Sequence, residues 1–107
     1  MTTRKPSAKA LIRALGRMKK NFISPVEFFS RWNKYRRMLY DTPEYKFFMT
    51  EVKDTADRKC ELCGRAGREV HHKVRVYDDP SLTLCVDNGI YLCVRCHKKQ
   101  HKQKRLS

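Results

Sequence analysis

Four of the five cysteines form two pairs with the same spacing. Cys60 and Cys63 make the first pair, and Cys93 and Cys96 make the second. Two intervening residues allow both thiolates of a pair to bind one ion, and two pairs complete the tetrahedral shell that Zn²⁺ prefers. We therefore expect a structural zinc site with four sulfur ligands, because reduced core cysteines would not explain two matched spacings. Cys85 stands apart, and we expect it to be a small buried apolar residue.

All four histidines of the sequence lie in the same part of the chain as the cysteines. His97 and His101 are four residues apart, so on a helix their rings project from one face and can share an ion. His71 and His72 are adjacent, and adjacent strand residues point to opposite faces of a sheet, so this pair could divide two roles. Two alternatives stay open: His97 could join the zinc shell, and the adjacent pair could be an exposed strand end.

The segment before the first cysteine predicts three helices, opened by the capping residues Ser7, Ser24 and Thr42. The apolar residues at helical spacing are Ala8, Leu11, Ile12, Leu15 and Met18, then Phe28, Phe29, Trp32, Tyr35, Met38 and Leu39, then Tyr45, Phe48, Met49 and Val52. We expect them to form the core. Base stacking by Trp32 or Tyr35 is the alternative to simple packing.

From residue 60 onward the sequence predicts short extended elements and one helix. A strand is expected over residues 68–74 and a second over residues 83–86. The run Asp87-Asn88-Gly89 indicates a turn, although the same Asn-Gly pair could have a further role. Residues 90–103 are expected to be helical and to carry the second cysteine pair and two of the histidines.

The net charge of +14 is concentrated at the two ends of the chain. Residues 1–40 hold 11 Lys or Arg and one acid, a net +10, whereas residues 41–70 carry −1 and residues 71–107 carry +5. A neutral middle with cationic ends suits a metal-binding core flanked by arms that contact phosphates. The residues expected to meet DNA are Arg13, Arg17, Lys19, Lys20, Arg31, Lys34, Arg36 and Arg37. The alternative is a pair of solvated basic tails.

Membrane insertion and secretion are not expected. The mean hydropathy is −0.75, and no stretch approaches the roughly 18 apolar residues of a membrane span. The first residues lack the apolar segment of a secretory signal. We therefore expect a cytoplasmic protein, in the host cell if a phage encodes it, with DNA as its partner and no membrane. The sequence leaves open whether the chain forms a homodimer or binds a phage protein.

Taken together, these residues resemble the HNH endonucleases, the ββα-metal nucleases, and in particular small phage-encoded members. The resemblance covers about residues 42–103 and rests on both cysteine pairs, on Val70-His71-His72, on Asn88, and on His97 with His101. It implies an α+β fold: a ββα-metal core stapled by a four-cysteine zinc site and preceded by basic helices. The expected division is a helical extension, residues 1–41, and a nuclease domain, residues 42–107.

The resemblance also implies a role for each polar residue. His71, His97 and His101 would bind a catalytic divalent ion (Mg²⁺, Mn²⁺, Ni²⁺ or Zn²⁺), and His72 would be the general base that activates water. Asn88 would orient that base and its loop. The implied reaction is hydrolysis of DNA phosphodiester bonds, by nicking or by double-strand cleavage, with the ion stabilising the phosphate and the leaving 3′-oxygen.

Two other functions fit the same residues. The first is a non-catalytic zinc module that binds DNA through the basic helices. The second is an RNase of the same fold and chemistry. The test that separates catalysis from binding is cleavage of nucleic acid in the presence of divalent ions.

Overall fold

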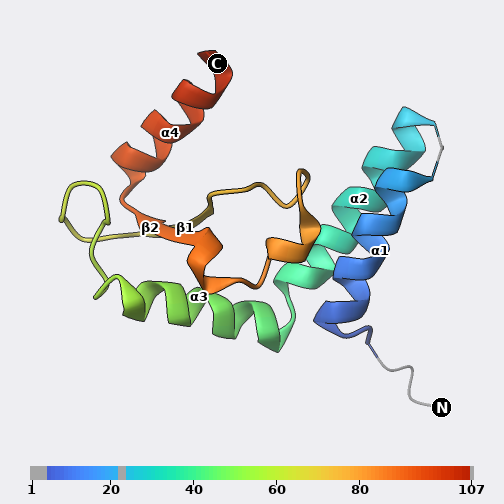
Figure 1. Ribbon diagram of the computed structural model, residues 1–107, viewed down its shortest axis with the longest axis horizontal. Helices are drawn as coiled ribbons and strands as arrows, with labels where there is room; N and C mark the ends of the chain where they lie inside the picture. The colour runs from blue at the N-terminus through green and yellow to red at the C-terminus, as the bar shows by residue number, and fades with distance from the viewer. Residues whose placement is uncertain (1–4, 22–23, 107) are drawn as a thin grey trace.

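The computed structural model describes residues 5–21 and 24–106, with side chains as far as Gln100. This part of the chain forms four α-helices and a two-stranded sheet. The elements are α1 (Ala8–Lys20), α2 (Pro25–Tyr40), α3 (Pro43–Thr55), β1 (Glu69–His72), the 3₁₀ turns η1 (Pro80–Leu82) and η2 (Val86–Asn88), β2 (Gly89–Leu92) and α4 (Val94–Leu106). Figure 1 shows α1 and α2 side by side at one end, α3 running beneath the sheet, and α4 leaving the other end. The predicted α+β class is confirmed.

The first three helices begin where the sequence predicts. The hydroxyl oxygens of Ser7, Ser24 and Thr42 accept backbone N–H groups three residues later, at 3.2, 3.3 and 3.2 Å. Each of these bonds satisfies a donor that would otherwise lack a partner in the first turn. Within the described residues, no helix combines the length and the apolar character needed to cross a bilayer.

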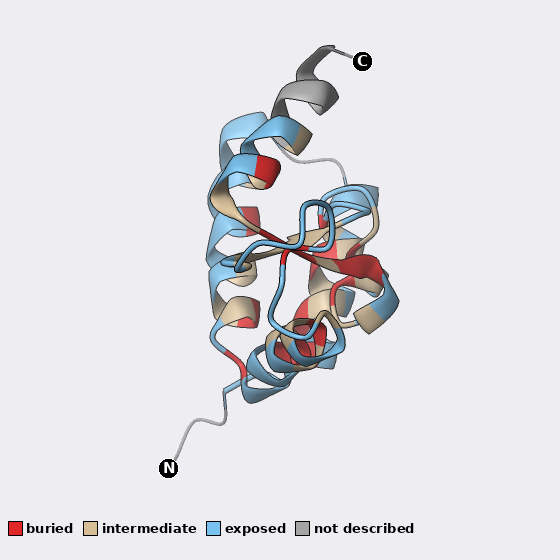
Figure 2. Cartoon of the chain, turned by 90° about the vertical axis from the view of Figure 1, so that its left-hand side faces the viewer, coloured by how far each residue is buried: buried red, intermediate tan, exposed pale blue. Residues whose placement is uncertain are grey.

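The buried residues, red in Figure 2, form three apolar clusters, the third of which is made by Cys60, Leu92 and Cys96. The first joins α1 and α2 to the loop after β1, because Val76 of that loop packs with Leu15 and Leu39. The second joins α3 to the sheet. Trp32 is only 5% exposed and belongs to the first cluster, as expected, whereas Phe29 is 58% exposed, so its predicted burial is wrong.

The sheet pairs β1 with β2 in antiparallel register, from Glu69 opposite Leu92 to His72 opposite Gly89. The strand predicted over residues 83–86 is therefore wrong, and so is the helix predicted to begin at residue 90. Four residues of which three are buried are compatible with either element, and pairing with β1 decides in favour of a strand. The helix begins only at Val94, after the strand has ended.

Close packing of β2 on α3 explains the glycine that opens the strand. A Cβ atom on Gly89 would lie 2.5 Å from Cγ2 of Val52, so this approach requires glycine. Upstream of it, Leu84 and Val86 pack against the clusters while Cys85 between them is exposed. The expectation that Cys85 is buried is wrong, because the chain turns into η2 at this point and alternate side chains face opposite directions.

Candidate active site and metal centre

Four sulfur atoms gather where the loop after α3 meets the start of α4. The Sγ atoms of Cys60, Cys63, Cys93 and Cys96 all lie within 4.8 Å of one another, and those of Cys63 and Cys93 are 3.7 Å apart. Four thiolates bound tetrahedrally to one Zn²⁺ at about 2.3 Å would be roughly 3.8 Å apart. The cluster could therefore hold zinc, as the cysteine spacing predicts.

Backbone hydrogen bonds shape the turn that carries the first pair. The N–H of Gly64 donates to the carbonyl oxygen of Cys60 at 2.9 Å, and Gly64 has a φ of 76°, a conformation that favours glycine. Burial opposes ionisation of the Cys60 thiol, but hydrogen bonds from the surrounding backbone lower its pKa to about 6. Because the thiolate is the form that binds a metal, this turn is suited to ligation.

Two of the predicted catalytic-metal ligands come together between β1 and α4. The ring centres of His71 and His97 are 5.1 Å apart and the rings meet edge to face, at 73°. An ion about 2.1 Å from a ring nitrogen lies roughly 3.2 Å from the ring centre, so two rings bound at about 109° would have centres roughly 5.2 Å apart. The separation fits shared ligation of one ion.

The carboxylate of Glu69 contacts the ring of His97. Nδ1 of His97 lies 2.6 Å from Oε2 of Glu69, on the same face of β1 as His71. A carboxylate bonded to one ring nitrogen fixes the tautomer and leaves Nε2 for a metal. This contact favours the histidine site over the zinc shell for His97. His101 follows one turn later on α4, but its side chain lies outside the described residues, so its place among the ligands stays a prediction.

His72 points to the other face of β1, as adjacency in a strand predicts. Its ring stacks on Phe48 of α3, with ring centres 5.3 Å apart and planes 8° from parallel. Its Nε2 lies 3.1 Å from the carbonyl oxygen of Thr83. Because a carbonyl only accepts, Nε2 carries the proton and Nδ1 is left to accept one. Burial lowers the pKa of His72, partly offset by that hydrogen bond, so the ring is neutral near pH 7.

Asn88 holds together the loop that joins the two strands. Its Oδ1 accepts the N–H of Val74 at 2.8 Å, and its Nδ2 donates to the carbonyl oxygens of Val74 at 3.0 Å and of Leu82 at 3.2 Å. The side chain is 6% exposed, so these bonds form away from water. The geometry suits the expected orienting role, since Thr83, the partner of His72, follows Leu82 directly.

The three described histidines open onto one cavity of about 410 Å³. Its lining residues are Trp32, Arg36, Tyr40, Tyr45, Val70, His71, His72, Arg75, Val76, Tyr77 and His97. The lining thus includes two arginines and three histidines, and α2 contributes Trp32, Arg36 and Tyr40 to it. An anion is the ligand that such a lining favours.

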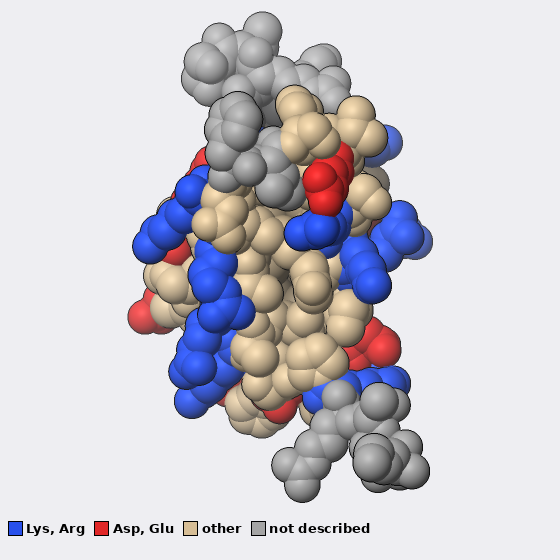
Figure 3. All heavy atoms as spheres, turned by 90° about the vertical axis from the view of Figure 1, so that its right-hand side faces the viewer, with Lys and Arg blue, Asp and Glu red and all other residues tan. Residues whose placement is uncertain are grey.

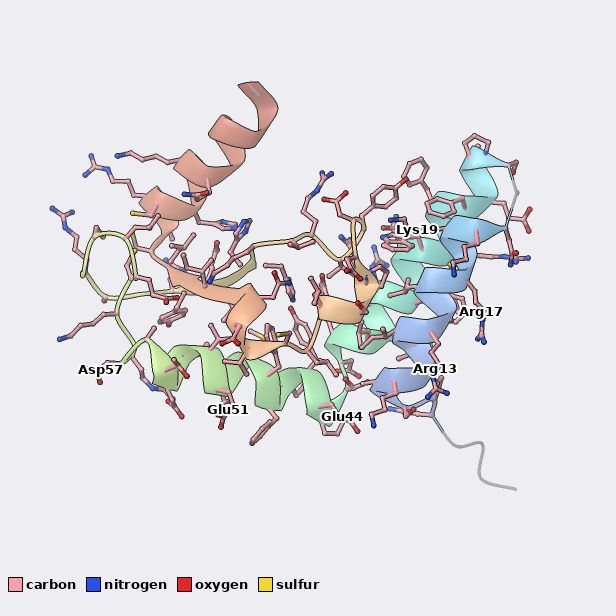
Figure 4. All side chains as sticks on the ribbon, viewed as in Figure 1. Arg13, Arg17, Lys19, Glu44, Glu51 and Asp57 are labelled. Atoms are coloured by element: carbon pink, nitrogen blue, oxygen red, sulfur yellow. The ribbon has the colours of Figure 1, made fainter. Side chains whose placement is uncertain are left out.

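The basic residues expected to meet DNA lie on α1 and α2. Seven of the eight are exposed and Arg36 is half-buried. Figure 3 shows Lys and Arg side chains bordering a strip of uncharged surface on this face, and Figure 4 shows Arg17 directed away from the body of the protein. Arg31 pairs with Glu27 at 2.7 Å, and Nζ of Lys19 donates to the carbonyl oxygen of Asp78 at 3.0 Å. DNA binding by these eight residues stays a prediction.

Sequence reasoning missed three participants in the site. Glu69 could have been found from strand alternation, because it lies two residues before His71 and therefore on the same face. Arg75 and Thr83 carried no local signal, since the loop that places Arg75 at the cavity and Thr83 beside His72 has no regular periodicity.

Comparisons with known proteins agree with this geometry. The family described as HNH endonuclease matches residues 60–103, which include both cysteine pairs and all four histidines. No relative was found among curated proteins. Among solved structures, the crystal structure of the HNH endonuclease of the deep-sea thermophilic bacteriophage GVE2 with a manganese ion is similar, with a TM-score of 0.71 and 20% identity, covering 78% of this chain and 96% of that one. The predicted resemblance, fold and nuclease class are confirmed.

Proposed function

We propose that this chain, a nuclease with an HNH domain at residues 60–103, hydrolyses phosphodiester bonds of DNA with the help of one divalent ion. The observation that carries the proposal is the shared cavity: a histidine pair at ligand separation and a half-buried histidine with a lowered pKa line the same space, together with two arginines. A phosphodiester fits that space, because its negative charge is attracted by the guanidinium groups and its hydrolysis requires both a base and an ion.

His72 is the proposed general base. The carbonyl of Thr83 holds the Nε2 proton, so Nδ1 takes the proton from the attacking water. The water oxygen forms a bond to phosphorus, and the bond from phosphorus to the 3′-oxygen breaks. The departing 3′-oxygen takes a proton from solvent, which leaves a 5′-phosphate and a 3′-hydroxyl, and His72 later releases its proton to solvent. Stacking on Phe48 and the bracing of the loop by Asn88 keep the ring in one orientation during this step.

His71, His97 and His101 are the proposed ligands of the catalytic ion, with Glu69 orienting His97. A bound divalent ion would polarise the phosphate and stabilise the leaving 3′-oxygen. Nitrogen ligands suit transition ions, and the GVE2 nuclease was crystallised with manganese, so Mn²⁺, Ni²⁺ and Zn²⁺ are the leading candidates, with Mg²⁺ also tested. For the sulfur cluster we propose Zn²⁺ in a purely structural role.

The N-terminal helices complete the proposal. Residues 1–41 would be a basic extension that contacts phosphates on either side of the cut, and residues 42–107 would be the nuclease domain. A phage origin and action in the host cytoplasm are consistent with the GVE2 likeness. The cut would be a nick or a double-strand break.

A plasmid-nicking assay tests the proposal. Purified protein is incubated with supercoiled DNA and, in separate reactions, with Mn²⁺, Ni²⁺, Zn²⁺ or Mg²⁺, alongside His72→Ala as the matched control. We expect cleavage with at least one ion and about 10²–10⁴-fold less with the variant. A folded RNA of equal mass is offered in parallel. Preference for RNA would favour the RNase alternative, and binding without cleavage under every ion would favour the DNA-binding module.

A further inference from the structure

One charged side chain that lines the cavity has a buried donor atom without an acceptor in the described part of the chain. Nε of Arg36, on α2, is the one buried side-chain nitrogen or oxygen atom in the described part of the chain that makes no hydrogen bond. Buried polar atoms almost always have a partner, so an orphaned donor on a charged side chain indicates a missing acceptor. Arg36 lines the cavity that also contains the histidines.

Aromatic side chains hold this guanidinium in place and connect it to the proposed base. Cζ of Arg36 lies 5.9 Å from the ring centre of Tyr40. Tyr40 stacks on Tyr45 at 4.4 Å, and the ring centre of Tyr45 is 6.1 Å from that of His72. A side chain supported in this way loses little freedom when it binds, so its five-donor fork is prearranged for a ligand.

The lining of the cavity defines the ligand. None of the described residues that line it is an Asp or a Glu, and Arg75, the second guanidinium, is exposed and already paired with Asp78 at 2.8 Å. Arg36 thus lines a space without a carboxylate, where a bound anion would be an acceptor for its guanidinium. A guanidinium matches the oxygens of a phosphate in a two-point contact, which an ammonium group cannot reproduce.

We infer that Arg36 binds the non-bridging oxygens of the phosphate that is cut, so that the N-terminal helices supply a catalytic residue as well as a DNA-binding surface. The inference rests on the proposed function, because it assigns Arg36 to the same phosphate on which His72 acts. Charge develops on those oxygens in the transition state, so Arg36 acts mainly on the chemical step.

Steady-state cleavage by Arg36→Met, compared with Arg65→Met, tests this assignment. Both changes remove one positive charge, but Arg65 is exposed in the loop that carries the first cysteine pair. We expect Arg36→Met to lower kcat by about 10²-fold with KM changed severalfold at most, and Arg36→Lys to restore only part of the rate. A kcat within threefold of wild type, or a loss confined to KM, would mean that Arg36 contacts another phosphate or none, and would overturn the inference.

Binding of inorganic phosphate separates this inference from the proposed function. Trp32 is the single tryptophan of the sequence and lines the same cavity, so its fluorescence reports occupancy without any cleavage. Wild-type protein, without added catalytic ion, should show a saturable change that Arg36→Met and Arg36→Lys lack or weaken at least tenfold. If the wild type binds phosphate in this manner but cuts no nucleic acid, the proposed function fails and the phosphate site stands. Equal binding by all variants overturns the site, and melting temperature with zinc content verifies that each variant is folded.

Discussion

The sulfur cluster and the histidine site meet on consecutive residues of α4, yet they differ in how they are enclosed. Cys60 and Cys96 are 2% and 8% exposed, Cys93 is half-buried and Cys63 is exposed, and the four sulfur atoms converge on one point. His71 and His97 are half-buried and open onto a cavity. Successive helix residues point about 100° apart, so Cys96 and His97 can serve different ions from one turn of helix.

This difference indicates that the sulfur cluster stabilises the fold and that the histidine site serves catalysis. A closed sulfur set has no position left for substrate and is suited to stabilise the fold, whereas a nitrogen set beside a cavity leaves coordination positions open. Changes on the sulfur side should therefore affect folding, and changes on the histidine side should affect catalysis.

The largest expected effect is that of Cys60→Ser. Structural zinc in small domains contributes about 10–16 kcal/mol, comparable to the whole free energy of unfolding of a domain. We therefore expect the variant to lose its zinc and its cooperative thermal transition, measured by metal analysis and circular dichroism. Cys85→Ser, an exposed cysteine outside the cluster, is the control and should melt like wild type. An unchanged melting temperature in Cys60→Ser would remove the sulfur site from any role in folding.

On the histidine side, His72→Ala should separate catalysis from folding. Loss of a general base lowers the rate by about 10²–10⁴-fold, while zinc content and DNA affinity stay close to those of the wild type. Single-turnover cleavage and fluorescence anisotropy measure the two quantities. Cleavage within threefold of wild type would exclude His72 as the base.

The pH dependence of cleavage should also reflect His72. Burial lowers its pKa below the ordinary value of about 6.5, partly offset by the hydrogen bond to Thr83, and only the neutral ring accepts a proton. The rate should therefore stay constant as the pH falls from 8 towards 6.5 and decline only below it. An acid limb centred above pH 7 would contradict this assignment.

A smaller effect is expected from Glu69→Ala. The carboxylate fixes the orientation of His97, and removal of such a partner weakens metal binding by about 10–100-fold. Titration with Mn²⁺ under cleavage conditions gives the apparent affinity. The matched control is Glu51→Ala on α3, whose labelled side chain lies on the far side of the helix from the sheet in Figure 4. Loss of the tightly bound zinc in Glu69→Ala would mean that the two metal sites are not separate.

The smallest effect belongs to the outer face of α1. Each phosphate contact made by a Lys or Arg adds about 0.9 to the slope of log affinity against log salt on duplex DNA. Replacing Arg13 and Arg17 with Gln should therefore flatten the slope by at most about 1.8 and leave kcat unchanged. If the variant and the wild type show the same salt dependence of DNA affinity, Arg13 and Arg17 do not contact DNA.

Local signals in the sequence predicted much of this structure. Capping residues marked the first three helices, and the matched spacing of the cysteines predicted their cluster. The adjacency of His71 and His72 also predicted that they face opposite sides of the strand.

The errors have a common physical cause. The strand Gly89–Leu92 depends on pairing with residues about twenty positions away, and no local propensity distinguishes it from the first turn of a helix. Arg36 was predicted only to contact DNA phosphates together with the other basic residues of the N-terminal helices, and its place in the cavity beside Arg75, Val76 and Tyr77 had no local signal. Long-range packing produced each feature that the sequence did not reveal.

The hydrogen bonds of Asn88 have a consequence for how the protein can be observed. They close a loop of more than a dozen residues with one amide, and the N–H groups of Lys73 and Val74 both donate to Asn88, through its carbonyl oxygen and its side chain. Those two backbone hydrogens should exchange slowly with solvent deuterium as long as the loop stays closed over His72. Their exchange rate would thus report how often the loop between β1 and β2 opens. NMR can measure this rate in the protein before any nucleic acid is added.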